Sequence, residues 1–257
     1  MPEWALFDIE ENYPVKKLGQ GLKQEIKMNK VKYTAVVLAA GSGSRMKSNV
    51  KKQFMDMLGK PLIYYALKQF EESPVDEIIL VTGEDAISYC KEEIVDNYDF
   101  KKVVQIVAGG KERYHSVYNA LKVANGEYVL IHDGARAFID QEIIERAMTG
   151  VEEYKACVIG VPVKDTIKVV DEEGYAVATP NRAALWQVQT PQCFITEEIL
   201  KAYEDMMAGS QAGITDDAMV MEQHGCRKIK LLEGSYNNMK MTTPEDILVG
   251  EMILKKL

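Results

Sequence analysis

The chain has 257 residues, of which 47% are hydrophobic and 27% charged, and its formal net charge at pH 7 is −8. This length supports one large domain, or a domain with a small appendage, and the composition excludes a disordered, collagen-like or coiled-coil protein. The acidic balance gives nucleic acid and anionic membranes no global attraction, so we expect neither as a partner. An anionic ligand would have to be held by a local basic cluster.

Segments that would target the chain to a membrane or to secretion are not evident. The longest apolar run near the start is Ala35–Ala40, far short of the roughly 18 residues that a membrane span needs. Residues 1–30 also lack the apolar centre of a secretory signal. We therefore expect a soluble, cytoplasmic protein. Its cysteines show no C-x-x-C spacing, which indicates reduced thiols rather than a zinc site or a disulfide framework: they are Cys90, Cys157, Cys193 and Cys226.

Residues 1–33 show little hydrophobic periodicity, with acids early and lysines later. Met28 stands shortly before the first predicted strand. We interpret residues 1–33 as an N-terminal extension that is either flexible or the result of a start site placed upstream of the true one; a regulatory or docking arm is less favoured. The main domain is then expected over residues 34–257.

From residue 34 onward, short β-branched runs alternate with longer amphipathic ones. This alternation is typical of β-α-β units around a largely parallel sheet, and it predicts an α/β fold with helices flanking the sheet. Helices are predicted over residues 61–70 and 113–124, and a last helix begins at Thr243-Pro244 and runs to about Lys256. Strands are predicted over residues 34–39, 77–82, 103–107, 128–132 and 156–161.

One segment interrupts this alternation. The runs Thr166–Val170 and Tyr175–Ala178 flank the turn Asp171–Gly174, a pattern that predicts an inserted β-hairpin. A protruding hairpin favours contact with a partner chain, and the alternative is a surface decoration on a monomer.

A glycine-rich loop directly follows the first predicted strand. Gly41 and Gly43 allow backbone N–H groups to approach an anion closely. Met46 occupies the position at which both the dinucleotide fingerprint and the P-loop require glycine, so neither motif is present. The surrounding cations reverse the sign of this acidic protein locally, with no acid among them: they are Arg45, Lys47, Lys51 and Lys52.

The motifs of this loop resemble the opening of sugar-phosphate nucleotidyltransferases. With the later motifs, residues 33–256 resemble the 2-C-methyl-D-erythritol 4-phosphate cytidylyltransferase family, which has a Rossmann-like, mostly parallel sheet. The motifs are Ala39-Ala40-Gly41-x-Gly43-x-Arg45-Met46, Lys52-Gln53, Gly59-Lys60-Pro61-Leu62, Gly109-Gly110-x-Glu112-Arg113-x-x-Ser116-Val117, His132-Asp133-Gly134-Ala135-Arg136, Val161-Pro162-Val163-Lys164-Asp165-Thr166, Arg182-x-x-Leu185-Trp186-x-x-Gln189-Thr190-Pro191-Gln192, Thr215-Asp216-Asp217 and Asn238-Met239-Lys240-Met241-Thr242-Thr243-Pro244-Glu245-Asp246.

The resemblance implies transfer of CMP from CTP to 2-C-methyl-D-erythritol 4-phosphate, with release of pyrophosphate, in non-mevalonate isoprenoid biosynthesis. It implies that Arg45 and Lys52 contact the triphosphate and stabilise the transition state, and that Arg182 and Lys240 position the acceptor. All four are implied to be catalytic. Asp133, expected at the carboxyl edge of the sheet, would bind Mg²⁺ or another divalent cation; without the family context, it could instead form a helix cap or a salt bridge with Arg136. The nucleotide-binding residues implied are Ala39, Ala40, Gly41, Gly43, Gly110 and Ser116. The acceptor-binding residues implied are Arg136, Thr166, Arg182, Thr190, Thr215 and Lys240.

The resemblance also implies a homodimer, in which a hairpin arm at about residues 164–184 reaches the second subunit. Thr166 and Arg182 would then complete the neighbour's active site. The chain departs from the usual family pattern at Lys51 and Ala137, where proline is common, and at His115, where an acid is common. Lys111 adds a cation beside the nucleotide loop.

Three other functions compete with this one. A ribitol-5-phosphate cytidylyltransferase shares the fold, the loop and the chemistry, although Arg182, Leu185-Trp186 and Thr190-Pro191-Gln192 favour methylerythritol phosphate. A non-catalytic CTP-binding scaffold would be expected to have lost its charged site residues, which are present here. An NAD-dependent oxidoreductase is disfavoured by Met46.

Overall fold

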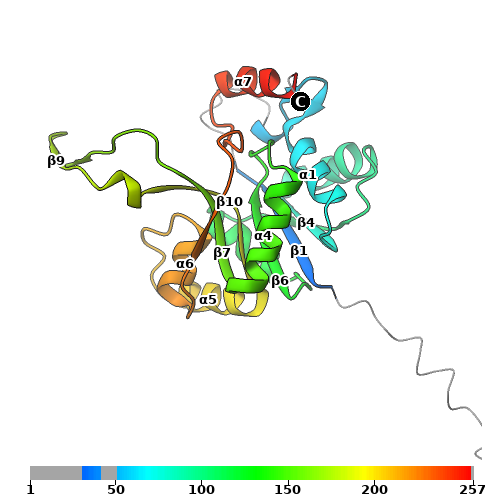
Figure 1. The fold of residues 1–257 in the computed structure, drawn as a ribbon. Helices are drawn as coiled ribbons and strands as arrows, with labels where there is room; N and C mark the ends of the chain where they lie inside the picture. Colours follow the sequence, from blue (N-terminus) through cyan, green and yellow to red (C-terminus); the bar gives the residue numbers. More distant parts are fainter. Residues whose placement is uncertain (1–30, 42–50, 256–257) are drawn as a thin grey trace, which may run out of the picture. The chain divides into compact units, whose positions relative to one another are not determined.

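The computed structural model describes residues 31–41 and 51–255 (Figure 1). These residues form one compact unit, built on a seven-stranded sheet with the order β11-β7-β10-β6-β1-β4-β5. Its strands are β1 (Tyr33–Ala39), β4 (Glu77–Thr82), β5 (Val103–Ala108), β6 (Tyr128–Asp133), β7 (Ala156–Pro162), β10 (Trp186–Ile195) and β11 (Lys230–Glu233). Its helices are α1 (Leu62–Glu72), α2 (Ile87–Tyr89), α3 (Arg113–Leu121), α4 (Gln141–Tyr154), α5 (Thr196–Ala208), α6 (Asp217–His224) and α7 (Pro244–Leu254).

The sheet is mostly parallel, as the sequence predicts. Strand β1 pairs in parallel with β4 and β6, β4 pairs in parallel with β5, and β11 with β7. The five predicted strands lie within one residue of the observed bounds at each end. The α/β class with helices around a Rossmann-like sheet is therefore confirmed.

Strand β10 is absent from the predicted elements, and it is the antiparallel member of the sheet, between β6 and β7. Pro191 lies inside it, and proline argues against a central strand. The pairing with β7 shifts register between Val188 and Gln192, on either side of this proline. The irregular stretch explains how a central strand accommodates a residue without a backbone donor.

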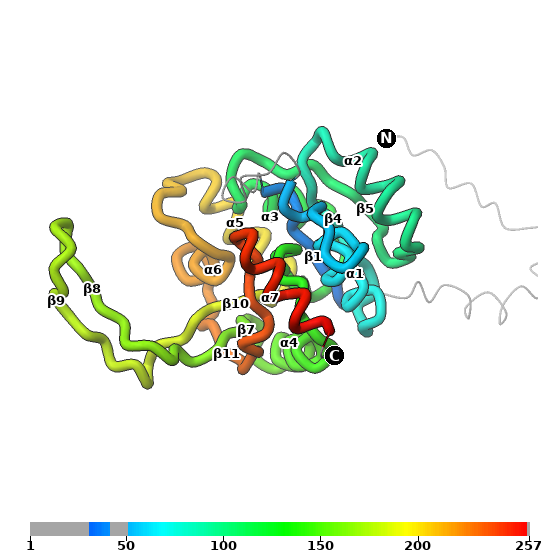
Figure 2. The backbone as a smooth tube through the Cα atoms, turned by 90° about the horizontal axis from the view of Figure 1, so that it is seen from above, coloured from blue at the N-terminus to red at the C-terminus, as the bar shows by residue number. Residues whose placement is uncertain are grey.

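The sheet separates two hydrophobic cores. Helices lie on both sides of its strands (Figure 2). Along β1, Val37 packs into the core that contains residues of α1 and α4, and Val36 packs into the core that contains residues of α3, α5 and α6. Neighbouring residues of a strand face opposite sides of a sheet, and both sides of this one are buried. A smaller core beneath α7 contains Met57, Phe138 and Met241.

The predicted hairpin is present as β8 (Val169–Val170) and β9 (Ala176–Ala178), which pair antiparallel in a separate two-stranded sheet. Figures 1 and 2 both show this arm projecting away from the seven-stranded sheet. A second small sheet is formed by β2 (Asp56–Met57) and β3 (Lys60–Pro61).

Helix α7 begins where the sequence predicts, with a capping box between Thr243 and Asp246 and with Pro244 in its first turn. The four cysteines are free thiols. In the described part of the chain, no helix combines the length and the apolar character that crossing a bilayer requires.

Candidate active site

A cavity of about 390 Å³ opens at the carboxyl edge of the parallel strands, next to the ends of β1 and β6. The chain runs from β1 outward to β4 and β5 and then returns to β6 on the other side of β1, so the strand order reverses here. Open α/β sheets bind ligands at such a switch point. The cavity is lined by Leu38, Ala39, Ala40, Gly41, Lys52, Gln53, Gly110, Lys111, Glu112, Arg113, Ser116, Asp133, Ala135, Lys240 and Thr242.

One wall of the cavity is the end of β1 together with the segment around Lys52. The buried Gln53 side chain donates a hydrogen bond from Nε2 to the carbonyl oxygen of Ala39. This contact fixes the short helix Lys52–Phe54 beside the first half of the glycine-rich loop. Lys52 therefore lies at the cavity with Ala39, Ala40 and Gly41. Gly43 and Arg45, which belong to the same predicted cluster, lie outside the described residues.

The opposite wall is the turn before α3. The Gly110 amide donates to Ser116 Oγ at 3.0 Å, and the Ser116 hydroxyl donates to the Glu112 carbonyl at 3.3 Å. A Cβ on Gly109 would lie 2.4 Å from the Ala40 Cβ, so glycine is required for the two walls to approach this closely. His115 accepts a hydrogen bond from the Glu112 amide at 3.2 Å and completes a capping box at the start of α3. The histidine that departs from the family pattern thus has a local structural role.

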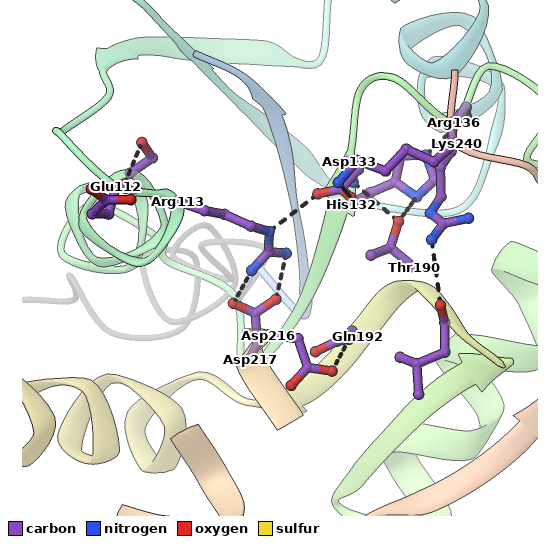
Figure 3. A network of polar contacts seen from close by, with 12 residues as sticks. Glu112, Arg113, His132, Asp133, Arg136, Thr190, Gln192, Asp216, Asp217 and Lys240 are labelled. Carbon is purple, nitrogen blue, oxygen red and sulfur yellow. Dashed lines mark hydrogen bonds and ion pairs between the residues drawn. The ribbon is translucent and has the colours of Figure 1, made fainter. Parts of the chain in front are cut away.

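Asp133 projects from the end of β6 into the cavity, where two cations bind its carboxylate (Figure 3). Lys240 Nζ lies 2.6 Å from Oδ2, and Arg113 Nε lies 3.2 Å from Oδ1. Burial alone would raise the pKa of Asp133, but the charges of Arg113 and Lys240 outweigh burial and hold the pKa well below its usual range. The carboxylate is therefore ionised at neutral pH.

Lys240 reaches Asp133 from a segment 107 residues further along the chain. The Met241 amide donates to the carbonyl oxygen of Ala135 at 2.9 Å, which fixes this segment against the loop that follows β6. The Thr242 amide donates to Asp246 Oδ2 at 2.6 Å, which joins the segment to the start of α7. The lysine is thus positioned by two elements that pack on each other only in the folded protein.

Behind Asp133, a buried chain of hydrogen bonds supports the end of β6. The Asp133 amide donates to Thr190 Oγ1 at 3.1 Å, and this hydroxyl lies 3.0 Å from His132 Nδ1. His132 Nε2 lies 3.1 Å from the carbonyl oxygen of Arg136. A carbonyl can only accept, so Nε2 carries the proton and Nδ1 accepts from Thr190. Burial lowers the pKa of His132 to about 4, which keeps the ring neutral.

A second cavity, of about 350 Å³, shares Lys240 and Thr242 with the first. Arg136 also lines it, and this arginine is held by a 2.8 Å hydrogen bond from Nη1 to the carbonyl oxygen of Asn238. The remaining lining residues are Gln187, Gln189, Tyr236 and Met239.

Four predicted acceptor-binding residues line neither cavity. Thr166 and Arg182 are exposed on the arm, where Arg182 Nη1 donates to the carbonyl oxygen of Lys164 at 2.8 Å. Thr215 is exposed just before α6. Thr190 is buried, and its hydroxyl serves the end of β6 as described above. Among the described residues, the structure therefore gathers Lys52 and the predicted nucleotide-binding residues with Asp133, Arg136 and Lys240, whereas the arm residues and Thr215 remain separate.

The main addition to the predicted site is Arg113, which lies in the Gly109-Gly110-x-Glu112-Arg113 motif but has no predicted role. It binds Asp133 and also forms a bidentate ion pair with Asp217, with both distances 2.8 Å. The sequence shows a cation shortly after Gly109-Gly110 and two adjacent acids at Asp216-Asp217. It does not show that the cation and the acids are in contact in the fold.

The side chains around Asp133 indicate how a divalent cation could bind there. Across residues 31–41 and 51–255, no three His, Cys, Asp or Glu side chains are grouped to hold a metal ion. Magnesium is usually bound through one or two carboxylates plus waters and substrate phosphates. An ionised carboxylate that faces the cavity, as Asp133 does, fits that mode.

An α/β sheet with a cation-lined cavity at its switch point defines a protein that binds a polyanion such as a nucleotide. A family model described as 2-C-methyl-D-erythritol 4-phosphate cytidylyltransferase matches residues 33–256. A curated protein of that name from Lachnoclostridium phytofermentans is 48% identical over 226 residues, covering 88% of this chain and 97% of its own. One from Lachnospira eligens is 50% identical over 225 residues, covering 86% and 99%.

Solved structures agree with the sequence relatives. The 4-diphosphocytidyl-2C-methyl-D-erythritol synthase of Anaerococcus prevotii superposes with a TM-score of 0.78 at 32% identity, covering 88% of this chain and 97% of its own. The 2-C-methyl-D-erythritol 4-phosphate cytidylyltransferase of Thermus thermophilus superposes with a TM-score of 0.70 at 26% identity, covering 86% and 98%. The chain belongs to the 2-C-methyl-D-erythritol 4-phosphate cytidylyltransferase family. It is an enzyme of the cytidylyltransferase type.

Proposed function

We propose how this chain performs the family's reaction, the transfer of the cytidylyl group from CTP to 2-C-methyl-D-erythritol 4-phosphate in isoprenoid biosynthesis. A phosphate oxygen of the acceptor attacks the α-phosphorus of CTP. The new P–O bond forms as the bond to the β-phosphate oxygen breaks and pyrophosphate leaves. No covalent bond to the protein is needed, so catalysis consists of alignment and of stabilising negative charge.

CTP is assigned to the larger cavity. The backbone at Ala39, Ala40 and Gly41 and the turn of Gly110 and Ser116 form opposite walls of a slot for the nucleotide, and the Gly109 approach to Ala40 supports this assignment. Lys52 lines the same cavity and would contact the triphosphate. Gly43 and Arg45 are assigned to the same ligand by the family resemblance alone.

Asp133 would hold a divalent cation, with magnesium as the first choice. When bound, such an ion neutralises phosphate charge and polarises the phosphorus centre. The protein's own contribution is an ionised carboxylate kept in place by Arg113. Lys240, now paired with Oδ2 of Asp133, would be free to interact with phosphate oxygens if a cation took its place.

The acceptor is assigned to the second cavity. Lys240 lines both cavities and would therefore lie between the two substrates, where the acceptor phosphate meets the α-phosphate. Arg136 supplies a further cation there, and its buried Nε has no hydrogen-bond partner among the described residues. Thr166, Thr190, Thr215 and Arg182 are assigned to acceptor binding or positioning by the resemblance.

We also propose a homodimer formed through the arm. A two-stranded hairpin is marginally stable alone in water, and this arm exposes Val170, Tyr175 and Val177 by 55%, 69% and 61%. Contact with a second subunit would bury these side chains. It would also bring Thr166 and Arg182 to the partner's cavities, which they do not reach in their own chain.

We also propose that the segment ahead of the family match, which starts at residue 33, is an extension outside the catalytic domain. The expected boundary after residue 33 is too late, because Tyr33 already belongs to β1. A cytoplasmic location is proposed as well, in keeping with a small-molecule biosynthetic role.

The single observation that carries the assignment is the ionised Asp133 between Arg113 and Lys240 in a cavity at the switch point. The test is pyrophosphate release from CTP and Mg²⁺, with 2-C-methyl-D-erythritol 4-phosphate and ribitol 5-phosphate in parallel. We expect release with the first acceptor, loss of release in Lys52→Ala, and normal release in Lys68→Ala, a surface lysine of α1. Release with ribitol 5-phosphate alone would overturn the substrate. CTP binding without pyrophosphate release in the presence of either acceptor would point to a scaffold.

A further inference from the structure

Arg113 is held by two carboxylates from different parts of the fold (Figure 3). Its Nε binds Asp133 Oδ1 at 3.2 Å, and its two terminal nitrogens bind the two oxygens of Asp217 at 2.8 Å each. A planar guanidinium that makes three such contacts cannot rotate without breaking all of them. The orientation of Arg113, and with it the Oδ1 side of Asp133, is therefore determined by where Asp217 lies.

Asp217 is itself fixed by contacts behind it. Its side chain is fully buried in the first turn of α6, and the Tyr203 hydroxyl of α5 donates to Oδ1 at 2.5 Å. The turn is pinned because Gln192 donates from Nε2 to Asp216 Oδ2 at 2.9 Å and accepts from the Ala218 amide at 2.8 Å. Neither Asp217 nor Tyr203 lines either cavity. Both act behind the wall on which the substrates would lie.

The charge balance of this cluster supports the same arrangement. Burial alone would lower the pKa of Arg113, but Asp217 and Asp133 raise it well above its usual value. Burial and the charge of Asp217 raise the pKa of Tyr203 well above its ordinary value, so the phenol keeps its proton for donation. A buried arginine with only one carboxylate partner would be less well compensated.

We propose that Tyr203 and Asp217 are positioning residues for cytidylyl transfer: they lock Arg113 so that it occupies Oδ1 of Asp133 and leaves Oδ2 as the oxygen that exchanges partners. This inference rests on the proposed function of Asp133. It also gives Arg113 a linking role, because the same residue begins α3, directly after the turn that lines the nucleotide cavity. The Arg113 guanidinium would thereby couple nucleotide binding in this cavity to the orientation of the Asp133 carboxylate.

The test compares Tyr203→Phe and Asp217→Asn with wild type in steady-state pyrophosphate release. Partners that orient a ligating side chain are typically worth about 10- to 100-fold in activity. We expect kcat to fall by about that factor in Asp217→Asn and by roughly tenfold or less in Tyr203→Phe, with the KM for CTP changed less than about threefold. In an Arg113→Lys background, Tyr203→Phe should have no further effect on kcat, because the group through which it acts is already altered.

Nitrogen-15 NMR of the arginine side chains supplies a readout that is independent of turnover. In the wild type, the terminal nitrogens of Arg113 should give separate resonances because the ion pair restricts their rotation, and these should merge in Asp217→Asn. Tyr128→Phe is the matched control. It removes the hydroxyl group of another buried tyrosine, whose oxygen lies 3.1 Å from Lys155 Nζ at the far end of β6, and it should leave kcat unchanged.

Two results would overturn the positioning role while the proposed function stands. One is an active wild type with unchanged kcat in Tyr203→Phe and Asp217→Asn. The other is an equal fall in kcat with and without Arg113→Lys, which would be the mark of a general structural defect. A wild type that releases no pyrophosphate with either acceptor, but keeps the separated Arg113 resonances, would instead overturn the proposed function and the inference built on it.

Discussion

Asp133 at the end of β6 and Arg182 on the β8–β9 arm are both candidate site residues, and their surroundings differ in almost every physical respect. The Asp133 side chain is 11% exposed and forms ion pairs with two cations. Its backbone is the end of the buried strand β6. Arg182 is exposed and makes a 2.8 Å contact to a carbonyl of its own arm. The candidate site at the sheet edge is formed within one chain, whereas the predicted site residues on the arm line no cavity of their own chain. A partner subunit would supply what the arm lacks.

The largest expected effect comes from breaking the sheet edge. Asp133→Ala removes the acceptor for both Arg113 and Lys240 and leaves two cations facing each other across the cavity. We expect kcat to fall by about 10²- to 10³-fold, comparable to the loss of one preorganised charge-stabilising group. Asp133→Asn, which keeps the shape, should be similarly impaired in pyrophosphate release. A kcat within about threefold of wild type would show that the carboxylate charge is not used.

Mixing two inactive variants sharpens the comparison between edge and arm. Asp133→Ala and Arg182→Ala should each be nearly inactive alone. If the arm completes the partner's site, random mixed dimers contain one intact site, and refolding or coexpression at equal amounts should restore about a quarter of wild-type activity. If Arg182 serves its own chain, no mixed dimer contains an intact site. Failure to recover activity, with mixed dimers detected by mass, would refute the shared site.

The buried hydrogen bonds behind Asp133 predict a pH-dependent stability. His132 has a pKa of about 4 in the folded protein, below the unfolded value of about 6.5. The unfolded chain therefore binds more protons between these values, so stability falls as the pH falls through this window. From pH 7 to pH 5 the loss should be about 2 kcal/mol, measured by denaturant unfolding.

The matched variants for this prediction are His132→Gln and His224→Gln. The first should lose most of the pH dependence, and the second, at the end of α6, should retain it. An identical pH dependence in the wild type and His132→Gln would show that another group is responsible.

The smallest expected effect concerns Lys51, where the family commonly has proline. Its φ of −58° and ψ of 136° already suit proline. Lys51→Pro removes the exposed ion pair with Asp85 but reduces the freedom of the unfolded chain, and these effects oppose each other. The Tm should shift by less than about 3 °C. Asp85→Ala removes only the ion pair and so separates the two effects. A Tm shift above about 3 °C for Lys51→Pro would contradict this prediction and reveal a further role of this segment.

Much of the fold could be predicted locally because the responsible signals are local. The β-branched runs predicted five strands, and Thr243-Pro244 predicted the start of α7. The hairpin was evident from its turn residues. Strand β10 was missed because Pro191 obscures a central strand, and its place between β6 and β7 depends on long-range pairing. The site residues on the two walls of the larger cavity followed from motifs, since each motif is a short contiguous segment.

The sequence by itself determined the α/β class, the protruding hairpin, the glycine-rich loop and the residues that place the chain in its family. Periodicity, turn chemistry and short motifs are properties of neighbouring residues. The tertiary structure alone decided that Arg113 meets Asp217 across 104 positions and that Lys240 meets Asp133 across 107. Which carboxylate neutralises which cation depends on the packing of α3, α6 and the segment before α7 around the sheet edge. No local pattern encodes such a pairing, because its energy exists only once burial has removed the competing water.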